Sequence, residues 1–206
     1  MVVTGIVEVT GCRSKIYIDD TFAFVLYKGE LRKYQITEGK EITQNIVDEI
    51  LGTILPKRAK LRSMSLLRSR PYTEKQMQDK LKQAFYPEEV IAEAIDYLKS
   101  FGYIDDLQYA QDYIEYHSKN KSRKQLELNL IKKGIGMSVV RKAFLLWGQA
   151  GGDIDENLQI FEWIRKKGYN VNTSDLKEKQ KMMAFLFRKG FDTSSICKAL
   201  NCEEFS

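Results

Sequence analysis

The chain has 206 residues, of which 43% are apolar and 30% charged, so it can bury a core without disulfide bonds or metal ions. Its apolar runs are too short to cross a membrane, and the N-terminal MVVTGIVEV is followed by neither the apolar segment nor the cleavage site of a signal peptide. These features exclude membrane-spanning and disulfide-framework classes. We expect a soluble, cytoplasmic, globular protein.

The cysteines and the single histidine give no indication of a reactive site. Cys12, Cys197 and Cys202 form no CxxC pair and leave one thiol over, so we expect them to be reduced and structural. His117 lies in a tyrosine-rich helical segment and lacks the positioned partners of a general base. We expect it to occupy a helix face.

The first 56 residues predict a small antiparallel sheet. Residues 14–27 alternate about an Asp-Asp turn, and this pattern predicts a hairpin with one face formed by Phe22, Phe24 and Leu26. Residues 3–9, VTGIVEV, predict a third strand. Thr43 is expected to cap a short helix that stops at Gly52, and Pro56 is expected to open the next helix.

From residue 57 onward the apolar period is helical. Thr73 and Ser122 are placed to cap amphipathic helices, and Pro87 is placed to start another. The pattern Leu-Ile-Lys-Lys-Gly-Ile at 130–135 superimposes without gaps on Leu-Phe-Arg-Lys-Gly-Phe at 186–191. Residues 81–86 match the same offsets, except that a phenylalanine, Phe85, replaces the glycine.

These matches predict three tandem repeats of three helices each, in an elongated array whose units bury their faces on one another. The first helix of each repeat is expected at about 57–69, 106–119 and 154–167. We therefore predict a mainly α protein with four domains: an N-terminal sheet and short helix at 1–56, and repeats at 57–105, 106–151 and 152–206.

The stretch GYIDD, residues 102–106, is expected to mark the boundary between two repeats. Gly102 allows the left-handed turn that ends one helix, Tyr103 and Ile104 can fill the joint, and Asp105 and Asp106 can cap the next helix. A catalytic or metal-binding carboxylate pair would need further ligands converging from elsewhere. We therefore interpret the two aspartates as structural.

An ordered set of residues resembles the RecX family of bacterial recombination regulators. The set comprises Leu66-Leu-Arg-Ser-Arg70, Tyr72-Thr73, Met77, Leu81, Leu98, Gly102-Tyr-Ile-Asp-Asp106, Tyr109-Ala110, Leu130 and Gly134-Ile135. The resemblance covers roughly residues 57–200, and the hairpin region is similar to an N-terminal extension that some members carry. Gln76 departs from the glutamate that is usual in this pattern.

The resemblance implies a regulator of the RecA recombinase. Family members bind RecA filaments on DNA, lie along or cap them, and restrain strand exchange, ATP turnover and LexA co-cleavage in DNA repair and the SOS response. Some also bind DNA directly, which makes single- and double-stranded DNA additional expected partners. The chain lacks a phosphate-binding GxxxxGK[ST] loop, a metal-ligand constellation and a Ser/His/Asp set, so we expect no enzymatic activity, cofactor or metal. We expect a monomer because the sequence has neither a coiled-coil heptad nor an obvious exposed apolar strip.

Basic residues in the repeats are the predicted contacts with phosphates or with an acidic RecA surface. The stretch from Lys119 to Lys142 has eight basic residues and one acid, Glu127. An ordinary solvated helix face is the alternative interpretation, and for Arg70 a contact with helix-end carbonyls is the alternative. The predicted site residues are Lys119, Lys121, Arg123, Lys124, Lys132, Lys133, Arg68, Arg70, Arg188 and Lys189.

Two other functions compete with filament regulation. A sequence-specific DNA-binding protein would need a basic recognition helix, whereas the helix after Pro87 carries several carboxylates that phosphates repel: Glu88, Glu89, Glu93 and Asp96. Sequence-independent DNA binding through residues 119–142 is compatible with the charge. A helical-repeat scaffold for an unrelated partner, with the hairpin as a second docking edge, is the third hypothesis.

Most aromatic residues and methionines fit helical core patterns, and none requires a cofactor. We expect core positions for Trp147, Trp163, Phe161, Met182 and Met183. Base stacking needs exposed aromatic side chains among cations, and Tyr113 and Tyr116 are the two residues that we expect to meet that condition.

Overall fold

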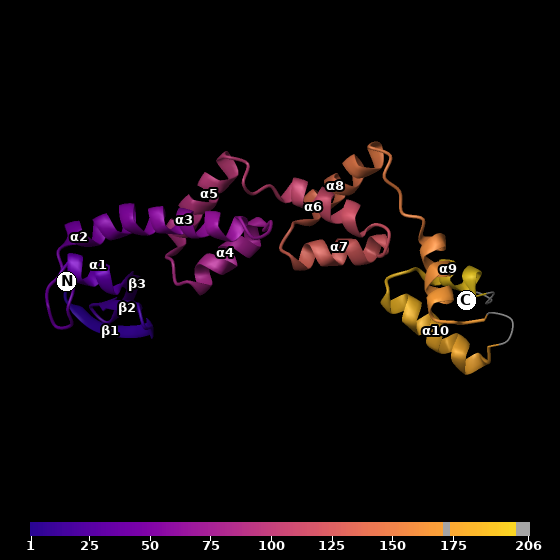
Figure 1. The fold of residues 1–206 in the computed structure, drawn as a ribbon, viewed down its shortest axis with the longest axis horizontal. Coiled ribbons are helices and arrows are strands. Elements are labelled where there is room, and N and C mark those ends of the chain that lie inside the picture. The colour runs from indigo at the N-terminus through magenta and orange to yellow at the C-terminus, as the bar shows by residue number, and fades with distance from the viewer. Residues whose placement is uncertain (171–173, 201–206) are drawn as a thin grey trace. The chain divides into compact units, whose positions relative to one another are not determined.

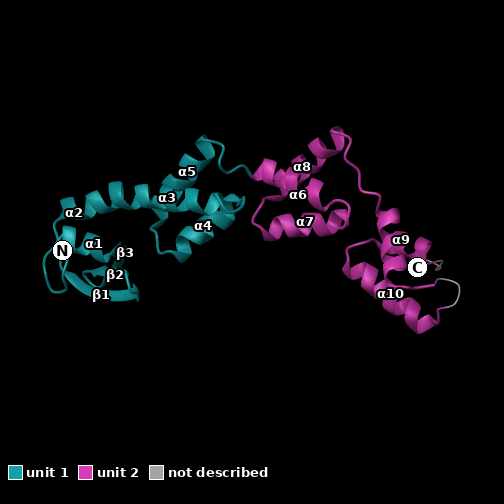
Figure 2. Ribbon diagram, in the orientation of Figure 1, with its two compact units in different colours: residues 1–105 teal, residues 106–206 magenta. Residues whose placement is uncertain are grey.

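The computed structural model describes residues 1–170 and 174–200, and it divides into two compact units between Asp105 and Asp106 (Figures 1 and 2). The protein is mainly helical with a small N-terminal sheet, as the sequence predicted. None of the helices in the described ranges is long and apolar enough to cross a membrane. Cys197 is buried and Cys12 is exposed, so the expected structural role is wrong for Cys12; Cys202 lies outside the described residues.

Unit 1 opens with the predicted sheet. Strands β1 (Val3–Thr10), β2 (Arg13–Ile18) and β3 (Thr21–Tyr27) are antiparallel in the order β1-β2-β3. Asp19 and Asp20 both have positive φ, 46° and 62°, which is the backbone of the two-residue turns that match the twist of a hairpin. The hairpin and the third strand are confirmed.

A bulge in β3 changes the predicted face of the hairpin. Ile16 pairs with Phe24 but the next residue, Tyr17, pairs with Phe22, so Ala23 is an extra residue on β3. The bulge turns Phe22 to the opposite face, where its ring meets that of Tyr17 edge-on at 5.9 Å between centroids. The predicted face therefore keeps Phe24, which is fully buried, and loses Phe22, which is exposed.

The predicted helix stop at Gly52 is wrong. Helix α1 (Lys28–Lys33) follows the sheet. A second helical stretch then runs without a break from α2 (Gln44–Glu49) through the π-helical turn η1 (Ile50–Ile54) to α3 (Leu55–Leu67). Gly52 lies inside η1. The side chains of Ile50 and Leu55, at the two ends of this turn, are buried in the core. Pro56 lacks an N–H, and the changed hydrogen-bond pattern of η1 just before it lets the helix continue.

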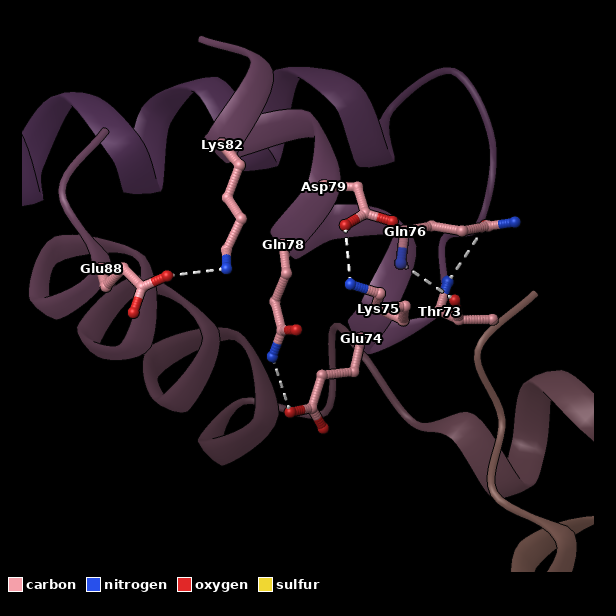
Figure 3. Close-up of polar contacts among 8 residues, drawn as sticks. All are labelled: Thr73, Glu74, Lys75, Gln76, Gln78, Asp79, Lys82 and Glu88. Atoms are coloured by element: carbon pink, nitrogen blue, oxygen red, sulfur yellow. Dashed lines mark hydrogen bonds and ion pairs between the residues drawn. The ribbon is translucent and has the colours of Figure 1, made fainter. Parts of the chain in front are cut away.

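Helices α4 (Glu74–Gln83) and α5 (Glu88–Ser100) complete the first repeat. The predicted cap of α4 is confirmed: Thr73 Oγ1 accepts from Gln76 N at 3.2 Å and Gln76 Oε1 accepts from Thr73 N at 3.4 Å (Figure 3). Glutamine thus replaces the usual glutamate in the capping box. The helices and the sheet bury one continuous core, so residues 1–56 and 57–105 form a single unit. The division of the chain into four domains stays a prediction.

Unit 2 contains the other two predicted sets of three helices. These are α6 (Asp106–His117), α7 (Arg123–Lys132) and α8 (Met137–Gln149), followed by α9 (Glu156–Lys166), α10 (Leu176–Arg188) and α11 (Thr193–Ala199). Each set has its own core, one around Ile114 and Leu130 and the other around Ile160 and Leu186. Unit 2 therefore resembles two modules rather than one enlarged core.

The internal repeat is visible in the backbone at three equivalent positions. Phe85, Gly134 and Gly190 have φ of +65°, +90° and +88°, and each follows the second helix of its repeat. Phe85 adopts this left-handed conformation at a cost that glycine would not incur. Lys15 Nζ lies 4.0 Å from the centre of its ring, a contact that offsets part of the strain.

The GYIDD stretch ends unit 1 largely as predicted. Gly102 has φ of +68° and follows Phe101, the C-cap of α5, and Ile104 is buried in the core of unit 1. Tyr103 is exposed within unit 1 and its ring stacks on that of Phe101, and the expectation that it fills a joint between repeats stays a prediction. Asp106 is the first residue of α6, where a carboxylate favours the positive end of the helix dipole.

Polar contacts connect the two sets of helices within unit 2. Ser122 caps α7, and its hydroxyl also donates to the Lys189 carbonyl at 2.9 Å. Gln159 Nε2 donates to the carbonyls of Ser118 and Lys121 in the loop between α6 and α7. These bonds attach the α6–α7 loop to the third repeat.

Asp192, the N-cap of α11, makes stability depend on pH. Its carboxylate accepts from Ser195 N and from the hydroxyls of Ser195 and Ser194, and these bonds lower its pKa from 3.8 to about 2. The pKa of Asp192 is lower in the folded state than in the unfolded state. Its contribution to the free energy of unfolding is therefore complete at a pH above the unfolded-state pKa, and it is lost as the pH falls through the folded-state pKa.

We expect Asp192→Ala to lower the free energy of unfolding by about 1 kcal/mol at neutral pH, the usual effect of losing a cap. The difference from wild type should shrink as pH falls below about 4. Urea unfolding of both proteins between pH 7 and pH 3 measures it. A difference that does not change with pH would show that the charge of this carboxylate has no part in the stabilisation.

Candidate functional site

Two tyrosines and two lysines form a cluster on the second repeat, which we call the tyrosine–lysine cluster: Tyr109, Tyr113, Lys121 and Lys133. The tyrosines lie one turn apart on α6, with near-parallel rings 6.5 Å apart between centroids. Lys133 Nζ is 5.6 Å from the Tyr109 ring centre and 5.2 Å from that of Tyr113. Lys121 Nζ lies 5.0 Å from the Tyr113 ring centre and donates to its hydroxyl at 2.9 Å. The rings therefore position both ammonium groups.

His117 borders this cluster without adding charge to it. Its ring lies 4.3 Å from that of Tyr113, between centroids. Burial lowers the pKa of His117 from its usual 6.5, and the positive charges of Lys121 and Lys133 lower it further. The imidazole is therefore neutral at pH 7, and the two lysines carry the positive charge of the cluster.

A similar arrangement occurs on the third repeat, which we call the tryptophan–lysine cluster: Trp163, Phe185, Lys166, Lys167 and Lys189. The rings of Trp163 and Phe185 meet edge-on at 5.5 Å between centroids. Lys189 Nζ lies 4.3 Å from the Trp163 ring centre, and Lys167 Nζ lies 4.9 Å from that of Phe185. Lys166 Nζ is 5.4 Å from the Trp163 ring but is also paired with Glu162 at 3.3 Å.

Lys166 and Lys167 were not among the predicted site residues, although the sequence contains a signal for them. Residues 166–168 read Lys-Lys-Gly, the same tripeptide as 132–134 and close to Arg-Lys-Gly at 188–190. Each tripeptide ends a helix, and its glycine has positive φ. A search for this helix-ending pattern, rather than for charge alone, would have found both lysines.

Two further predicted residues stand at the start of α7 and differ in their surroundings. Arg123 stacks on the Phe144 ring at 4.7 Å and pairs with Glu127 at 3.1 Å, so its charge is partly neutralised. Lys124 Nζ lies 6.0 Å from the ring centre of Phe187, a side chain that is 59% exposed. Lys124 and Phe187 together therefore present a cation beside an accessible ring.

The remaining predicted residues are exposed helix-end positions. Lys119 follows α6, Lys132 ends α7 and Arg188 ends α10. Arg68 and Arg70 belong to unit 1, where Arg68 follows α3 and the Arg70 guanidinium stacks on the Tyr72 ring at 4.4 Å. The other eight predicted residues lie in unit 2.

The exposed aromatic residues differ from those expected. Tyr116 is 80% exposed, as base stacking would require, whereas Tyr113 is partly covered by the lysines of its cluster. Phe161 is exposed rather than in the core, so its predicted position is wrong. Met182 is buried and Trp163 is packed at the edge of the third core, as expected.

A tandem set of three-helix modules whose lysines are ordered on aromatic rings is typical of a binding protein. Comparison with known proteins agrees with this class. Two family models match the chain, one for the first three-helix domain of RecX over residues 59–98 and one for the third over residues 155–200.

Relatives of known name match most of the chain. A regulatory protein RecX from Caldanaerobacter subterraneus subsp. tengcongensis is 30% identical over 187 residues, which cover 90% of this chain and 91% of the relative. One from Clostridioides difficile is 30% identical over 193 residues, covering 92% and 88%. The chain belongs to the RecX family.

Solved structures support the fold. A crystal structure of regulatory protein RecX superimposes with a TM-score of 0.60 at 23% identity, covering 97% of this chain and 98% of the other. That of RecX from Lactobacillus salivarius gives a TM-score of 0.56, also at 23% identity, over 72% of this chain and 96% of the other.

Proposed function

We propose that the chain is a regulatory protein that binds RecA filaments on DNA and restrains the recombinase, ATPase and co-protease activities of RecA in DNA repair and the SOS response. The observation that carries this proposal is the 30% identity to a regulatory protein RecX over 90% of the chain. We place this activity in the cytoplasm and assign it to a monomer.

The two clusters of unit 2 support the proposal because a nucleoprotein filament presents many negative charges. Lysines held against aromatic rings lose less side-chain freedom on binding than lysines that extend into solvent. On the first repeat, by contrast, Lys75 pairs with Asp79 and Lys82 with Glu88 (Figure 3). Lys75 and Lys82 of α4 therefore have nearby carboxylates that compete with an external anion.

Co-sedimentation with RecA filaments tests the proposal directly. RecA is assembled on single-stranded DNA with a slowly hydrolysed ATP analogue, the protein is added, and the pellet is assayed at several salt concentrations. We expect the protein to sediment with filaments at concentrations where it does not sediment with the same DNA alone. Equal sedimentation with naked DNA and with filaments would contradict a RecA-dependent interaction.

Sequence-independent DNA binding is the second candidate function. It is favoured by the exposed rings of Tyr116 and Phe187, which lie close to the basic stretch of residues 119–142. Affinity for naked single strands should then fall steeply with salt, by a slope of about 0.7 per phosphate contact on a log–log plot. A scaffold for another partner is the remaining alternative, and capture of other proteins but no RecA would favour it.

A further inference from the structure

Helix α7 is apolar on two sides. Leu126 and Leu130 are fully buried in the core of the second repeat, whereas Leu128 is 49% exposed and Ile131 is 38% exposed. Residues three positions apart are neighbours on a helix surface, so Leu128 and Ile131 lie on one face. A surface helix needs only one apolar stripe to pack on its core. The face with Leu128 and Ile131 is therefore a second apolar stripe, and it is exposed to solvent.

The first repeat shows that the fold does not require apolar side chains at these two positions. The offset that matches residues 81–86 to residues 130–135 places Asp79 at the position of Leu128 and Lys82 at that of Ile131. On α4 both residues form surface ion pairs, Asp79 with Lys75 at 2.9 Å and Lys82 with Glu88 at 2.8 Å (Figure 3). Packing within a repeat thus does not explain the apolar residues of α7.

The third repeat extends this stripe. Phe187 on α10 stands at the position equivalent to Ile131, and it too is exposed. Lys124, one turn before Leu128 on α7, has its Nζ 6.0 Å from the centre of the Phe187 ring. Lys124 therefore connects the exposed apolar residues of both helices into one surface. We call this surface the apolar strip: Ile131, Leu128 and Phe187.

A cavity of about 570 Å³ opens beside Phe187. Lys124 and the turn between α10 and α11 also line it. Three carboxylates in its wall already have partners in the protein: Glu127 pairs with Arg123 at 3.1 Å, Glu156 accepts from Arg123 N at 3.0 Å, and Asp192 caps α11. Lys124 disfavours a further cation, so we expect the cavity to receive an apolar side chain. An anchor of this kind contributes strongly to a protein interface.

Exposed cations border the strip at both ends and in the middle. Lys132 follows Ile131 at the end of α7, Arg188 follows Phe187 at the end of α10, and Lys124 lies between the two helices. Carboxylates beside the apolar side chains of a partner would complement these charges. Nucleobases stack on aromatic rings, whereas Leu128 and Ile131 are aliphatic, so the strip favours protein over nucleic acid.

We propose that the apolar strip docks a segment of a partner protein whose apolar side chains are flanked by carboxylates. The apolar side chains pack on Leu128, Ile131 and Phe187, and the carboxylates face Lys124, Lys132 and Arg188. This inference deepens the proposed function and rests on it, since the partner is then RecA. It assigns to the second and third repeats a contact with the protein of the filament in addition to its DNA.

A variant that carries the first-repeat residues tests the proposal. Leu128→Asp with Ile131→Lys gives α7 the same residues as α4 at both positions and leaves the net charge unchanged. We expect near wild-type stability in urea and a loss of affinity for RecA filaments of about tenfold or more, measured by co-sedimentation. Affinity for naked single-stranded DNA at the same salt concentration should change by less than about twofold, because the charge is the same.

Two further variants complete the test. The matched control is Leu158→Asp with Phe161→Lys, which makes the same changes at the same spacing on two exposed positions of α9, outside the strip. We expect it to bind filaments as wild type does. Lys124→Gln should lower filament affinity by about threefold at low salt and by less at high salt, because salt screens its attraction to carboxylates.

The outcomes separate this inference from the proposed function. Wild-type protein that does not sediment with filaments would contradict the proposed function, and the inference with it. If wild type sediments, equal sedimentation of the α7 variant would overturn the inference alone, and so would an equal loss in the α9 control. A parallel loss of naked-DNA binding in the α7 variant would assign the strip to nucleic acid. Unchanged affinity of Lys124→Gln at low salt would contradict carboxylates in the docked segment.

Discussion

Replacing Lys132 and Lys133 by glutamate is expected to weaken inhibition of RecA by roughly tenfold or more while leaving the fold intact. Lys133 belongs to the tyrosine–lysine cluster, and Lys132 is its exposed neighbour at the end of α7. Neither side chain lies in the core, so the substitutions change charge without opening a cavity. The measurement is RecA ATP turnover with increasing amounts of each variant, at low and at moderate salt.

The matched control for this variant is Lys28→Glu with Lys57→Glu. Both lysines are exposed in unit 1 and the change in net charge is identical. We expect this control to inhibit RecA nearly as well as wild type. Equal loss in the two double variants would show that only net charge matters, and unchanged inhibition by the Lys132/Lys133 variant at both salt concentrations would remove these residues from the site.

Replacing Gly190 by alanine is expected to lower the free energy of unfolding by roughly 2–4 kcal/mol. Gly190 has φ of +88°, and a Cβ there would lie 2.6 Å from Ser122 Oγ. Ser122 cannot move away without losing its bond to the Lys189 carbonyl and its role as the cap of α7. The variant should therefore loosen the contact between the second and third repeats. Urea unfolding followed by circular dichroism measures the change.

Gly168→Ala is the control for this prediction because Gly168 also has positive φ, +63°, but nothing lies within 4 Å of the added Cβ. We expect Gly168→Ala to lower the free energy of unfolding by only about 1 kcal/mol, because backbone strain is its sole effect. Combining Gly190→Ala with Ser122→Ala removes the crowded hydroxyl, so the double variant should be more stable than the sum of the single changes predicts. Two results would show that the close approach to Ser122 does not affect stability. One is an equal loss of unfolding free energy in Gly190→Ala and Gly168→Ala, and the other is a double variant whose loss equals the sum of the losses of Gly190→Ala and Ser122→Ala.

The repeat architecture was predictable because its signals are local. Leu130, Gly134 and their counterparts in the other repeats record a helix end, a left-handed residue and a helix start within a few positions of one another. The bulge at Ala23 and the π-helical turn across Gly52 were not predictable, because both depend on how neighbouring segments pack. A glycine in the sequence does not reveal whether the burial of the residues on either side of it will stabilise a helix that continues through it.

In the candidate site, too, local features were predictable from the sequence and contacts between segments were not. The run from Lys119 to Lys133 is evident as charge, but the ring that each lysine contacts is not, since Lys189 meets Trp163 on another helix. The structural role of Gln159 gave no signal either, because a glutamine on a helix is ordinary until its two hydrogen bonds to the α6–α7 loop are placed. Contacts between helices decide the site, and local patterns do not specify them.

RecA ATP turnover on single-stranded DNA, with this protein added in substoichiometric amounts, tests the central claim most directly. A DNA-binding control is run at the same salt concentration. We expect inhibition well below one protein per RecA, at concentrations where naked DNA is little bound. No inhibition, or inhibition only when the DNA itself is saturated, would contradict filament regulation and would favour general DNA binding or scaffolding.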